Sequence, residues 1–376
     1  MAPAVIDLRS ADDPQDVVHR AVQALAEGKL IAVPTETVYG LAASALHPEA
    51  VARLSSVKNR SAGQPFTLAI KSADEAPDYV PELSTLAERL ARRCWPGPLT
   101  LVLSNNHPDS LVHQFAPSVR EAVSPNGSIG LRVPAHELLL SILRLTAGPV
   151  ALTSANRTGD RETLTAAEVV EALQDDIDLV LDDGQSKFGQ PSSVVRIEGE
   201  ELELLRLGVI DEKALHRLSC LIVLFVCTGN TCRSPMAEVL MRRAIAGKIA
   251  CPEDELEDRG CMVLSAGTAA MAGGKASPEA VSVMTERGLD LTAHESQPLG
   301  ERLVRFSDLI LTMTRGHREA ILAQWPEAEP RIRVLCRSQG DVADPIGGPI
   351  QAYRRCAEQI DDELESWLSE LELPAR

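Results

Sequence analysis

The stretch LIVLFVCTGNTCRSPMAE, residues 221–238, decides the fold of the second half of the chain. Its first six residues are all apolar, which is typical of a strand that is buried on both faces in a parallel sheet. Cys227 and Arg233 then lie at the two ends of a short polar loop, and Pro235 suits the first position of a helix. The stretch therefore predicts a buried strand, a tight loop and a helix, in that order.

The loop between the expected strand and helix has the chemistry of an anion site. Backbone amides at a helix N-terminus bind a phosphate group, and their positive field favours the thiolate form of Cys227. Arg233 offers two parallel N–H groups to phosphoryl oxygens, which lysine cannot do. We expect Ser234 to cap the helix and to donate a hydrogen bond to the sulfur, and Asn230 to hold the loop. The remaining members of the expected phosphate loop are Thr228, Gly229, Thr231 and Cys232. Cys232 is either a buried packing residue or a thiol that forms a disulfide with oxidised Cys227 and so protects it from irreversible oxidation.

A second motif, DVADPIGGPIQAY at 341–353, supplies the acid that such a site needs. Asp344 precedes a proline and two glycines, in a loop that can bring its carboxyl group over the leaving atom and protonate it. An Asp-Pro pair alone is common in turns. A single cysteine near a single arginine could likewise be coincidence, but the ordered strand, Cys-x5-Arg-Ser loop, proline and helix favour a catalytic thiol.

Residues 221–376 resemble the low-molecular-weight protein tyrosine phosphatases. The resemblance rests on VCTGNTCRSPMAE and on SAGT at 265–268, DLILTMT at 308–314 and DPIGG at 344–348. It implies a doubly wound parallel sheet and a phosphatase that forms a phosphocysteine on Cys227. It also implies that Arg233 binds phosphate, that Asp344 acts as general acid and then as base for water, and that neither a metal ion nor a cofactor is needed.

One residue of the loop, Thr231, bears on the substrate. Relatives that act on phosphotyrosine carry a bulky aliphatic residue there and an aromatic residue shortly after the Asp-Pro, whereas Ile346 and two glycines follow the Asp-Pro in this chain. A threonine hydroxyl can accept a hydrogen bond from a guanidinium group. In this the loop resembles that of the bacterial protein arginine phosphatases, which share CTGNTCRS. Phosphoarginine proteins are therefore the expected substrates, and phosphotyrosine proteins are the alternative.

The first part of the chain alternates short β-rich runs with helical patterns from Leu30 to Ile210, which predicts a mixed α/β domain. Taken singly, its polar motifs could be turns or solvated helix ends. Together they resemble the threonylcarbamoyl-adenylate synthase family over about residues 14–210, which implies a YrdC-like domain with a twisted open α/β sheet. The motifs are AVPTETVYGLAASA at 32–45, SVKNRSAGQP at 56–65, TSANRTG at 153–159, GQPSSVVRI at 189–197 and LRLGVI at 205–210.

The resemblance to the synthases implies a reaction of L-threonine, bicarbonate and ATP. The products are threonylcarbamoyl-adenylate and pyrophosphate, and the adenylate serves the modification of adenosine 37 in certain tRNAs. Mg2+ normally accompanies ATP, and no side chain of the protein is expected to be a metal ligand. Thr35 is expected to face threonine. The residues expected to bind the nucleotide are Lys58, Arg60, Ser154 and Asn156, and those expected around phosphate or carbamate are Arg132, Ser192 and Arg206.

Ala69 leaves two hypotheses open for this domain. The synthases usually have a histidine at that position, so a ligand contact is missing there. The chain is therefore expected to be a bifunctional enzyme, or else a phosphatase fused to a catalytically inactive nucleotide- or RNA-binding module. The formal net charge of -17 disfavours strong direct binding to nucleic acid, so the link to tRNA is expected to be indirect.

The composition of the whole chain sets its class. A length of 376 residues and a hydrophobic content of 44% predict two domains, at 1–210 and 221–376, with a polar linker at 211–220. Eight cysteines are too sparse for a disulfide framework, and the N-terminus has acids where a signal peptide needs a basic segment. No apolar stretch reaches the roughly 18 residues of a membrane helix. We expect a cytoplasmic α/β protein: a YrdC-like twisted open sheet, followed by a doubly wound, Rossmann-like parallel sheet that acts on phosphorylated proteins.

Overall fold

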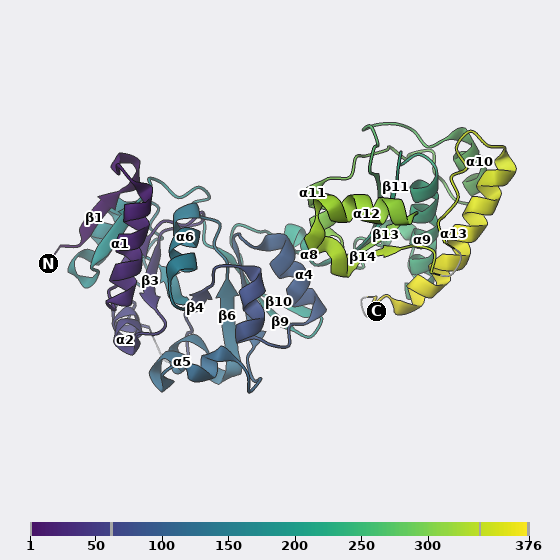
Figure 1. Ribbon diagram of the computed structural model, residues 1–376. Helices are drawn as coiled ribbons and strands as arrows, with labels where there is room; N and C mark the ends of the chain where they lie inside the picture. Colours follow the sequence, from purple (N-terminus) through teal and green to yellow (C-terminus); the bar gives the residue numbers. More distant parts are fainter. Residues whose placement is uncertain (1, 61–62, 338–339, 374–376) are drawn as a thin grey trace. The chain divides into compact units, whose positions relative to one another are not determined.

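The computed structural model describes residues 2–60, 63–337 and 340–373. The chain divides into two compact units, Met1–Leu215 and His216–Arg376, and Figure 1 shows a separate sheet in each. The segment expected as a polar linker forms helix α8 (Glu212–Ser219), so the division falls within a helix. The side chain of Asp211 accepts the N–H of Ala214 at 2.7 Å, as helix-capping aspartates do.

The first unit is built on a ten-stranded mixed sheet with the order β1-β8-β2-β3-β7-β4-β6-β5-β9-β10. Four neighbouring pairs are parallel and five are antiparallel, which confirms the mixed α/β class. The strands are β1 (Ala4–Asp7), β2 (Ile31–Val33), β3 (Gly40–Ser44), β4 (Thr67–Ala69), β5 (Leu99–Ser104), β6 (Ser128–Arg132), β7 (Val150–Ser154), β8 (Leu179–Asp182), β9 (Ser193–Glu198) and β10 (Glu201–Arg206).

Helices α1 and α6 are amphipathic and pack their apolar side chains against β2, β7 and β8 in one hydrophobic cluster. Val17 of α1, Leu139 of α6 and Ile31 of β2 are buried members of this cluster. The α-helices of the unit before α8 are α1 (Pro14–Ala26), α2 (Pro48–Val57), α3 (Ala76–Tyr79), α4 (Thr85–Cys94), α5 (Pro117–Val123), α6 (Glu137–Leu145) and α7 (Ala166–Leu173).

Strand pairing brings the motifs of the first unit together. The loop that carries Pro-Thr-Glu-Thr connects β2 to β3, and Gly40 at the start of β3 pairs with Ser154 at the end of β7. Strands β5 and β9 pair in parallel with Leu99 opposite Ser193, so Ser192 lies at the same end of this pair as the start of β5. The sheet therefore gathers segments that are far apart in the sequence.

The second unit has a four-stranded parallel sheet in the order β12-β11-β13-β14. All seven residues of β11 are buried, which confirms the expected central strand. The strands are β11 (Leu221–Cys227), β12 (Cys261–Gly267), β13 (Leu309–Thr312) and β14 (Ile332–Val334), and the α-helices are α9 (Arg233–Ile249), α10 (Pro278–Glu286), α11 (Glu301–Phe306), α12 (Arg315–Gln324) and α13 (Ile350–Glu370).

Alternate residues of β11 face two different hydrophobic clusters. Phe225 packs in one cluster with residues of α9, α10 and α13, whereas Leu224 packs in the other with residues of α11 and α12. Helices therefore cover both faces of the sheet, which confirms the doubly wound architecture. Cys227 lies at the carboxyl end of the central strand, where open α/β sheets bind their ligands.

Candidate active sites

Cys227 is the last residue of β11 and is 2% exposed. The backbone N–H of Asn230 donates to its Sγ at 3.2 Å, and the hydroxyl oxygen of Ser234 lies 2.9 Å from the same sulfur. The side-chain amide of Asn230 donates to Ser234 Oγ at 3.0 Å, so the hydroxyl proton can point to the sulfur at 2.9 Å, which is nearer than the other acceptor, the Ala266 carbonyl oxygen at 3.4 Å. Two donors therefore stabilise negative charge on Cys227.

Ser234 does not cap helix α9, contrary to the expectation from its place in the sequence. The helix begins at Arg233 with Cys232 at the N-cap, so Ser234 already lies in the first turn. Its hydroxyl is fully buried and is shared between the Cys227 sulfur and the Asn230 amide. The proline that follows is therefore the third helical residue rather than the first.

Asn230 holds the loop in a left-handed turn, with a φ of 54°. Besides Ser234, its side-chain amide donates to Ser265 Oγ at 2.8 Å, and its Oδ1 accepts the N–H of Gln297 at 2.9 Å. The carboxamide is fully buried and all its polar groups are used. Ser265 belongs to the SAGT motif, but the sequence did not indicate this contact.

A second polar layer lies behind Asn230. Ser265 Oγ donates to Glu238 Oε2 at 2.6 Å, and burial raises the pKa of Glu238. The imidazole of His294 lies 2.8 Å from the Asn230 carbonyl oxygen. Gly267 follows on β12, where a Cβ atom would lie 2.5 Å from the Thr228 carbonyl oxygen, so only glycine allows the phosphate loop to approach this strand so closely.

Arg233 is 5% exposed and joins the phosphate loop to the predicted acid. Its Nη2 donates to Asp344 Oδ2 at 2.5 Å, and its Nη1 donates to the Val342 carbonyl oxygen at 3.3 Å. The Asp344 side chain is 42% exposed, and its Oδ1 accepts the N–H of Ile346. The guanidinium of Arg233 and the carboxyl group of Asp344 therefore lie together at the opening of the phosphate loop, which we call the mouth of the site. The carboxyl group is the more exposed of the two.

The other loop residues divide between the rim and the interior. Gly229 and Thr231 are half-buried, and Thr231 Oγ1 lies 3.6 Å from the sulfur of Cys232. Cys232 is buried, with Ser277 Oγ at 3.3 Å and Tyr353 Oη at 3.7 Å from its sulfur. The Thr228 side chain is exposed and its hydroxyl lies 2.8 Å from the imidazole of His317, a residue that sequence reasoning missed.

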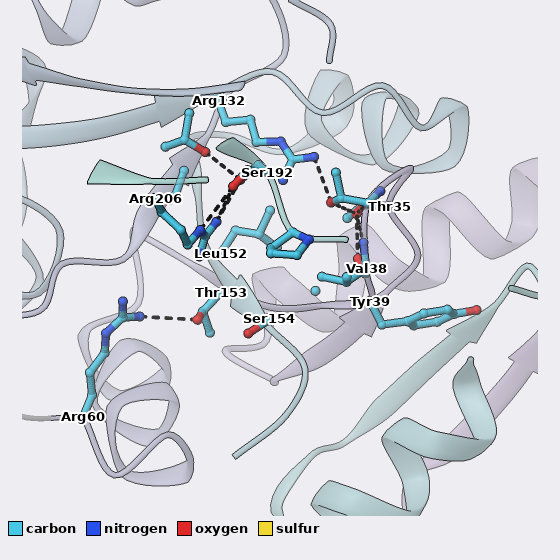
Figure 2. A pocket seen from close by; sticks show the side chains of 15 residues that line it. Thr35, Val38, Tyr39, Arg60, Arg132, Leu152, Thr153, Ser154, Ser192 and Arg206 are labelled. Atoms are coloured by element: carbon cyan, nitrogen blue, oxygen red, sulfur yellow. Dashed lines mark hydrogen bonds between the residues drawn. The ribbon is translucent and has the colours of Figure 1, made fainter. Parts of the chain in front are cut away.

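A polar pocket in the first unit gathers most of the residues expected there, as Figure 2 shows. They come from the β2–β3 loop, the segment after α2, the residue before β9 and the ends of β6, β7 and β10. The expected residues that line the pocket are Thr35, Arg60, Arg132, Ser154, Ser192 and Arg206, and the two that do not line it are Lys58 and Asn156.

Arg132 is fixed by a buried ion pair that the sequence did not indicate. Its Nη2 donates to Glu36 Oε1 at 2.7 Å and to Thr37 Oγ1 at 3.1 Å, and both members of the ion pair are 6% exposed. Glu36 Oε2 also accepts the N–H of Ala135 at 3.0 Å. The guanidinium therefore has a defined position on the side of the pocket next to Thr35 (Figure 2).

Arg206 and Arg60 carry the positive charge on the other side of the pocket. Arg206 Nη2 donates to the carbonyl and hydroxyl oxygens of Ser192 at 2.8 and 3.1 Å, and Arg60 Nη1 donates to Thr153 Oγ1 at 3.4 Å (Figure 2). Burial, with a contribution from Arg206, lowers the pKa of Arg60 to about 10. Burial and the neighbouring Arg206 make it costly to keep Arg60 charged. An anionic ligand would reduce this cost, so the two arginines favour binding of an anion.

Lys58 supports the pocket from behind. Its Nζ donates to the Ser154 carbonyl oxygen at 2.9 Å and to Asn156 Oδ1 at 3.0 Å, so it fixes the Ser-x-Asn turn. Burial lowers the pKa of Lys58 to about 8. Ala69, where a ligand contact was expected to be missing, is fully buried in a hydrophobic cluster and is not among the residues that line the pocket.

Two properties of the described residues bear on ligands and location. Across residues 2–60, 63–337 and 340–373, no cluster of three or more histidine, cysteine, aspartate or glutamate side chains is arranged to hold a metal ion. No helix in the same parts of the chain has the length and apolarity needed to cross a membrane.

The two sites define the class of protein: a mixed-sheet unit with an arginine-lined pocket, joined to a parallel-sheet unit with a thiol in a phosphate loop. A family model of the Sua5, YciO and YrdC proteins, described as "Telomere recombination", matches residues 23–208, and one described as "Low molecular weight phosphotyrosine protein phosphatase" matches residues 222–374. The chain belongs to both families, one in each unit.

Relatives of both kinds are known. The protein-arginine-phosphatase of Bacillus subtilis is 42% identical over 153 residues, which are 40% of this chain and 93% of that protein. The threonylcarbamoyl-AMP synthase of Pyrococcus abyssi is 37% identical over 192 residues, 51% of this chain and 54% of that protein, so the chain spans about half the length of this relative. A solved structure of a double variant of P. abyssi Sua5 has a TM-score of 0.52 and 25% identity, and the match covers 82% of this chain and 99% of that one.

Proposed function

We propose that the second unit is a phosphatase that works through a phosphocysteine. The observation that carries this proposal is the pair of hydrogen-bond donors on the Cys227 sulfur at the N-terminus of a 17-residue helix. The sulfur attacks phosphorus, Arg233 holds the phosphoryl oxygens, and Asp344 gives its proton to the leaving group. Asp344 then takes a proton from water, which attacks phosphorus and releases phosphate and the thiolate.

Phosphoarginine proteins are the substrates that the mouth of this site suits best. Asp344 and the half-buried Thr231 present oxygen acceptors, which a guanidinium leaving group can use and a phenyl ring cannot. Ile346, which is 68% exposed, stands where an aromatic wall would be needed for phosphotyrosine. The B. subtilis relative named protein-arginine-phosphatase supports the same assignment.

The phosphatase proposal is tested by offering phosphoarginine, phosphotyrosine and phosphoserine peptides side by side to the full chain. We expect phosphoarginine to be hydrolysed fastest and Cys227→Ser to be inactive on all three. Thr231→Ile should shift the preference toward phosphotyrosine. Equal rates on phosphoarginine and phosphotyrosine would reject the substrate assignment, and more than a tenth of wild-type activity in Cys227→Ser would reject the nucleophile.

For the first unit we propose threonylcarbamoyl-adenylate synthesis from L-threonine, bicarbonate and ATP. The observation that carries it is a pocket with three arginines, of which Arg60 and Arg206 form no direct ion pair with a carboxylate among the described residues. Such a pocket suits the α-phosphate of ATP and a carbamate, where charge develops in the reaction. The P. abyssi relative named threonylcarbamoyl-AMP synthase supports this assignment, and the product would pass to enzymes that modify tRNA.

Mg2+ would be held mainly by the phosphates of ATP, and Glu162, which is not among the residues that line the pocket, is the protein ligand that we propose for it. Glu162 Oε2 is buried and has no hydrogen-bond partner among the described residues. Its negative charge acts on Lys58 and Arg206. Magnesium sites that use nucleotide phosphates need only one or two carboxylates, so Glu162 fits this role. The ion would neutralise phosphate charge, and ATP and threonine place the reaction in the cytoplasm.

The synthase proposal is tested by measuring pyrophosphate release from ATP with and without L-threonine. We expect release that depends on threonine and bicarbonate and that is strongly reduced in Arg60→Gln and Lys58→Ala. The alternative, a catalytically inactive nucleotide-binding module, predicts ATP binding without threonine-dependent release. The position of Ala69 outside the pocket lining favours the active enzyme.

A further inference from the structure

Thr228 follows the nucleophile directly and is the most exposed residue of the phosphate loop. Residues 229–234 are half-buried or buried, whereas the Thr228 side chain is exposed. Its Oγ1 lies 2.8 Å from His317 Nε2. No other hydrogen-bond partner of this hydroxyl lies among the described residues. Nothing in the thiolate mechanism described above uses this hydroxyl or the imidazole.

His317 is held firmly by the start of helix α12. It is 8% exposed, and its backbone N–H donates to the Oγ1 of the capping Thr314 at 3.1 Å. The same Oγ1 lies 2.8 Å from His317 Nδ1. Oγ1 accepts the backbone N–H and can donate its own proton to Nδ1. In that tautomer the neutral imidazole carries its proton on Nε2 and donates it to Thr228; in the other tautomer Thr228 donates to Nε2 and keeps both lone pairs for a ligand.

Helix α12 is joined to the segment that carries Asp344, because the N–H of Arg315 at the start of the helix donates to Asp341 Oδ1 at 2.9 Å. Burial lowers the pKa of His317, and Arg233 lowers it further, while Asp344 and Asp341 raise it. The imidazole therefore lies close enough to feel both the phosphate-binding guanidinium and the predicted acid. Thr228 follows the nucleophile directly, and its partner His317 belongs to the helix joined to the Asp344 segment, so we place the Thr228 hydroxyl beside the path of the leaving group.

A hydroxyl has one proton and two lone pairs. When His317 Nε2–H uses one lone pair of Thr228 Oγ1, the second lone pair and the hydroxyl proton remain available. A guanidinium leaving group offers several N–H donors, and the oxygen can accept one of them. A phenyl leaving group has no N–H to offer. The imidazole thus orients an acceptor that only the guanidinium can use.

We propose that Thr228 is a specificity-determining residue that accepts a hydrogen bond from the guanidinium of phosphoarginine, and that His317 is the residue that positions it. The proposal rests on the phosphoarginine phosphatase function proposed above. It is independent of Thr231, which lies three residues further along the loop and has its hydroxyl 3.6 Å from the Cys232 sulfur rather than near the imidazole.

The test compares two substrates in the full chain: a phosphoarginine peptide and 4-nitrophenyl phosphate, which has no N–H donor. Thr228→Val should lower kcat/KM for the peptide about tenfold or more, because a hydrogen bond to a charged group is lost, and should change the aryl phosphate by less than about threefold. Thr228→Ser, which keeps the hydroxyl, should stay close to wild type. Thr285→Val is the matched control, since it removes an exposed threonine hydroxyl from helix α10.

The positioning role is tested by combining variants. His317→Ala should lower kcat/KM for the peptide selectively, and it should cause no further loss in the Thr228→Val background, because it acts through that hydroxyl. Melting temperatures identify any variant that loses activity by unfolding, and Thr228→Ser then decides the question. Equal losses on both substrates, or a Thr228→Ser enzyme as slow as Thr228→Val, would overturn the proposal. A wild-type enzyme that is inactive on the peptide would instead reject the phosphoarginine assignment itself.

Discussion

Replacement of Ser234 by alanine tests the phosphatase mechanism at the atom that the structure defines best. The Ser234 hydroxyl is fully buried, lies 2.9 Å from the Cys227 sulfur and accepts a hydrogen bond from Asn230 at 3.0 Å. Removing it takes away one of the two donors on the sulfur and leaves the Asn230 N–H at 3.2 Å. A hydrogen bond to a charged group contributes about 1.5–3 kcal/mol, which corresponds to about 10- to 150-fold in a rate constant.

The loss should fall mainly on the second chemical step. When the phosphocysteine is hydrolysed, the thiolate of Cys227 is the leaving group. In Ser234→Ala the negative charge that develops on this sulfur lacks the hydrogen bond from the serine hydroxyl. Ser234→Ala should therefore accumulate the phosphocysteine. With 4-nitrophenyl phosphate, rapid mixing should show a burst of about one 4-nitrophenol per enzyme followed by a slow steady state.

Ser307→Ala is the matched control for this experiment. Ser307 is also fully buried, but its hydroxyl donates to the Leu303 carbonyl oxygen at the end of α11, away from the phosphate loop. This variant should show wild-type kinetics. A steady-state rate for Ser234→Ala within about twofold of wild type, or the same burst in both variants, would refute the argument that the hydroxyl stabilises the thiolate.

Three further outcomes are expected. Asp344→Asn should slow leaving-group departure by about 10²-fold or more while inorganic phosphate still inhibits at wild-type concentrations, and an unchanged rate would assign the acid elsewhere. After inactivation by peroxide, thiol treatment should restore the activity of the wild type more fully than that of Cys232→Ser. Equal recovery would show that Cys232 is only a buried packing residue, a role that its contacts with Ser277 and Tyr353 also allow. Because the pKa of Lys58 is lowered to about 8, ATP binding measured by calorimetry should weaken as the pH rises through about 8, and should weaken less in Lys58→Arg. The same pH profile in both proteins would exclude Lys58 as the titrating group.

Contiguous features of the site could be predicted from the sequence. Strand, loop and helix follow one another from Leu221 to Ile249, so apolar runs and the Cys-x5-Arg-Ser spacing define them directly. Even here the sequence placed Ser234 at the cap of the helix. The correct role depends on where the loop brings Asn230 and the sulfur, and this depends on the left-handed turn at Asn230.

Contacts between distant segments could not be predicted in the same way. Glu36 and Arg132 are 96 residues apart, and Thr228 and His317 are 89 residues apart. Each member of these pairs taken alone resembles an ordinary polar residue. Only the pairing of strands in the two sheets brings them within hydrogen-bond distance. The Pro-Thr-Glu-Thr and SAGT motifs marked the right segments, but they did not show which atoms would meet.

The electrostatics of the two sites explain how a chain with a net charge of -17 can hold anionic ligands. Arg132 and Arg233 are each paired with a carboxylate, which fixes their position and neutralises much of their charge. Arg60 and Arg206 have hydroxyl and carbonyl partners instead, and burial lowers the pKa of both. Since a ligand phosphate would relieve that cost, Arg60 and Arg206 would supply most of the affinity of the first pocket for anions in the proposed synthase, whereas Arg233 and Asp344 would act together on one substrate group in the proposed phosphatase.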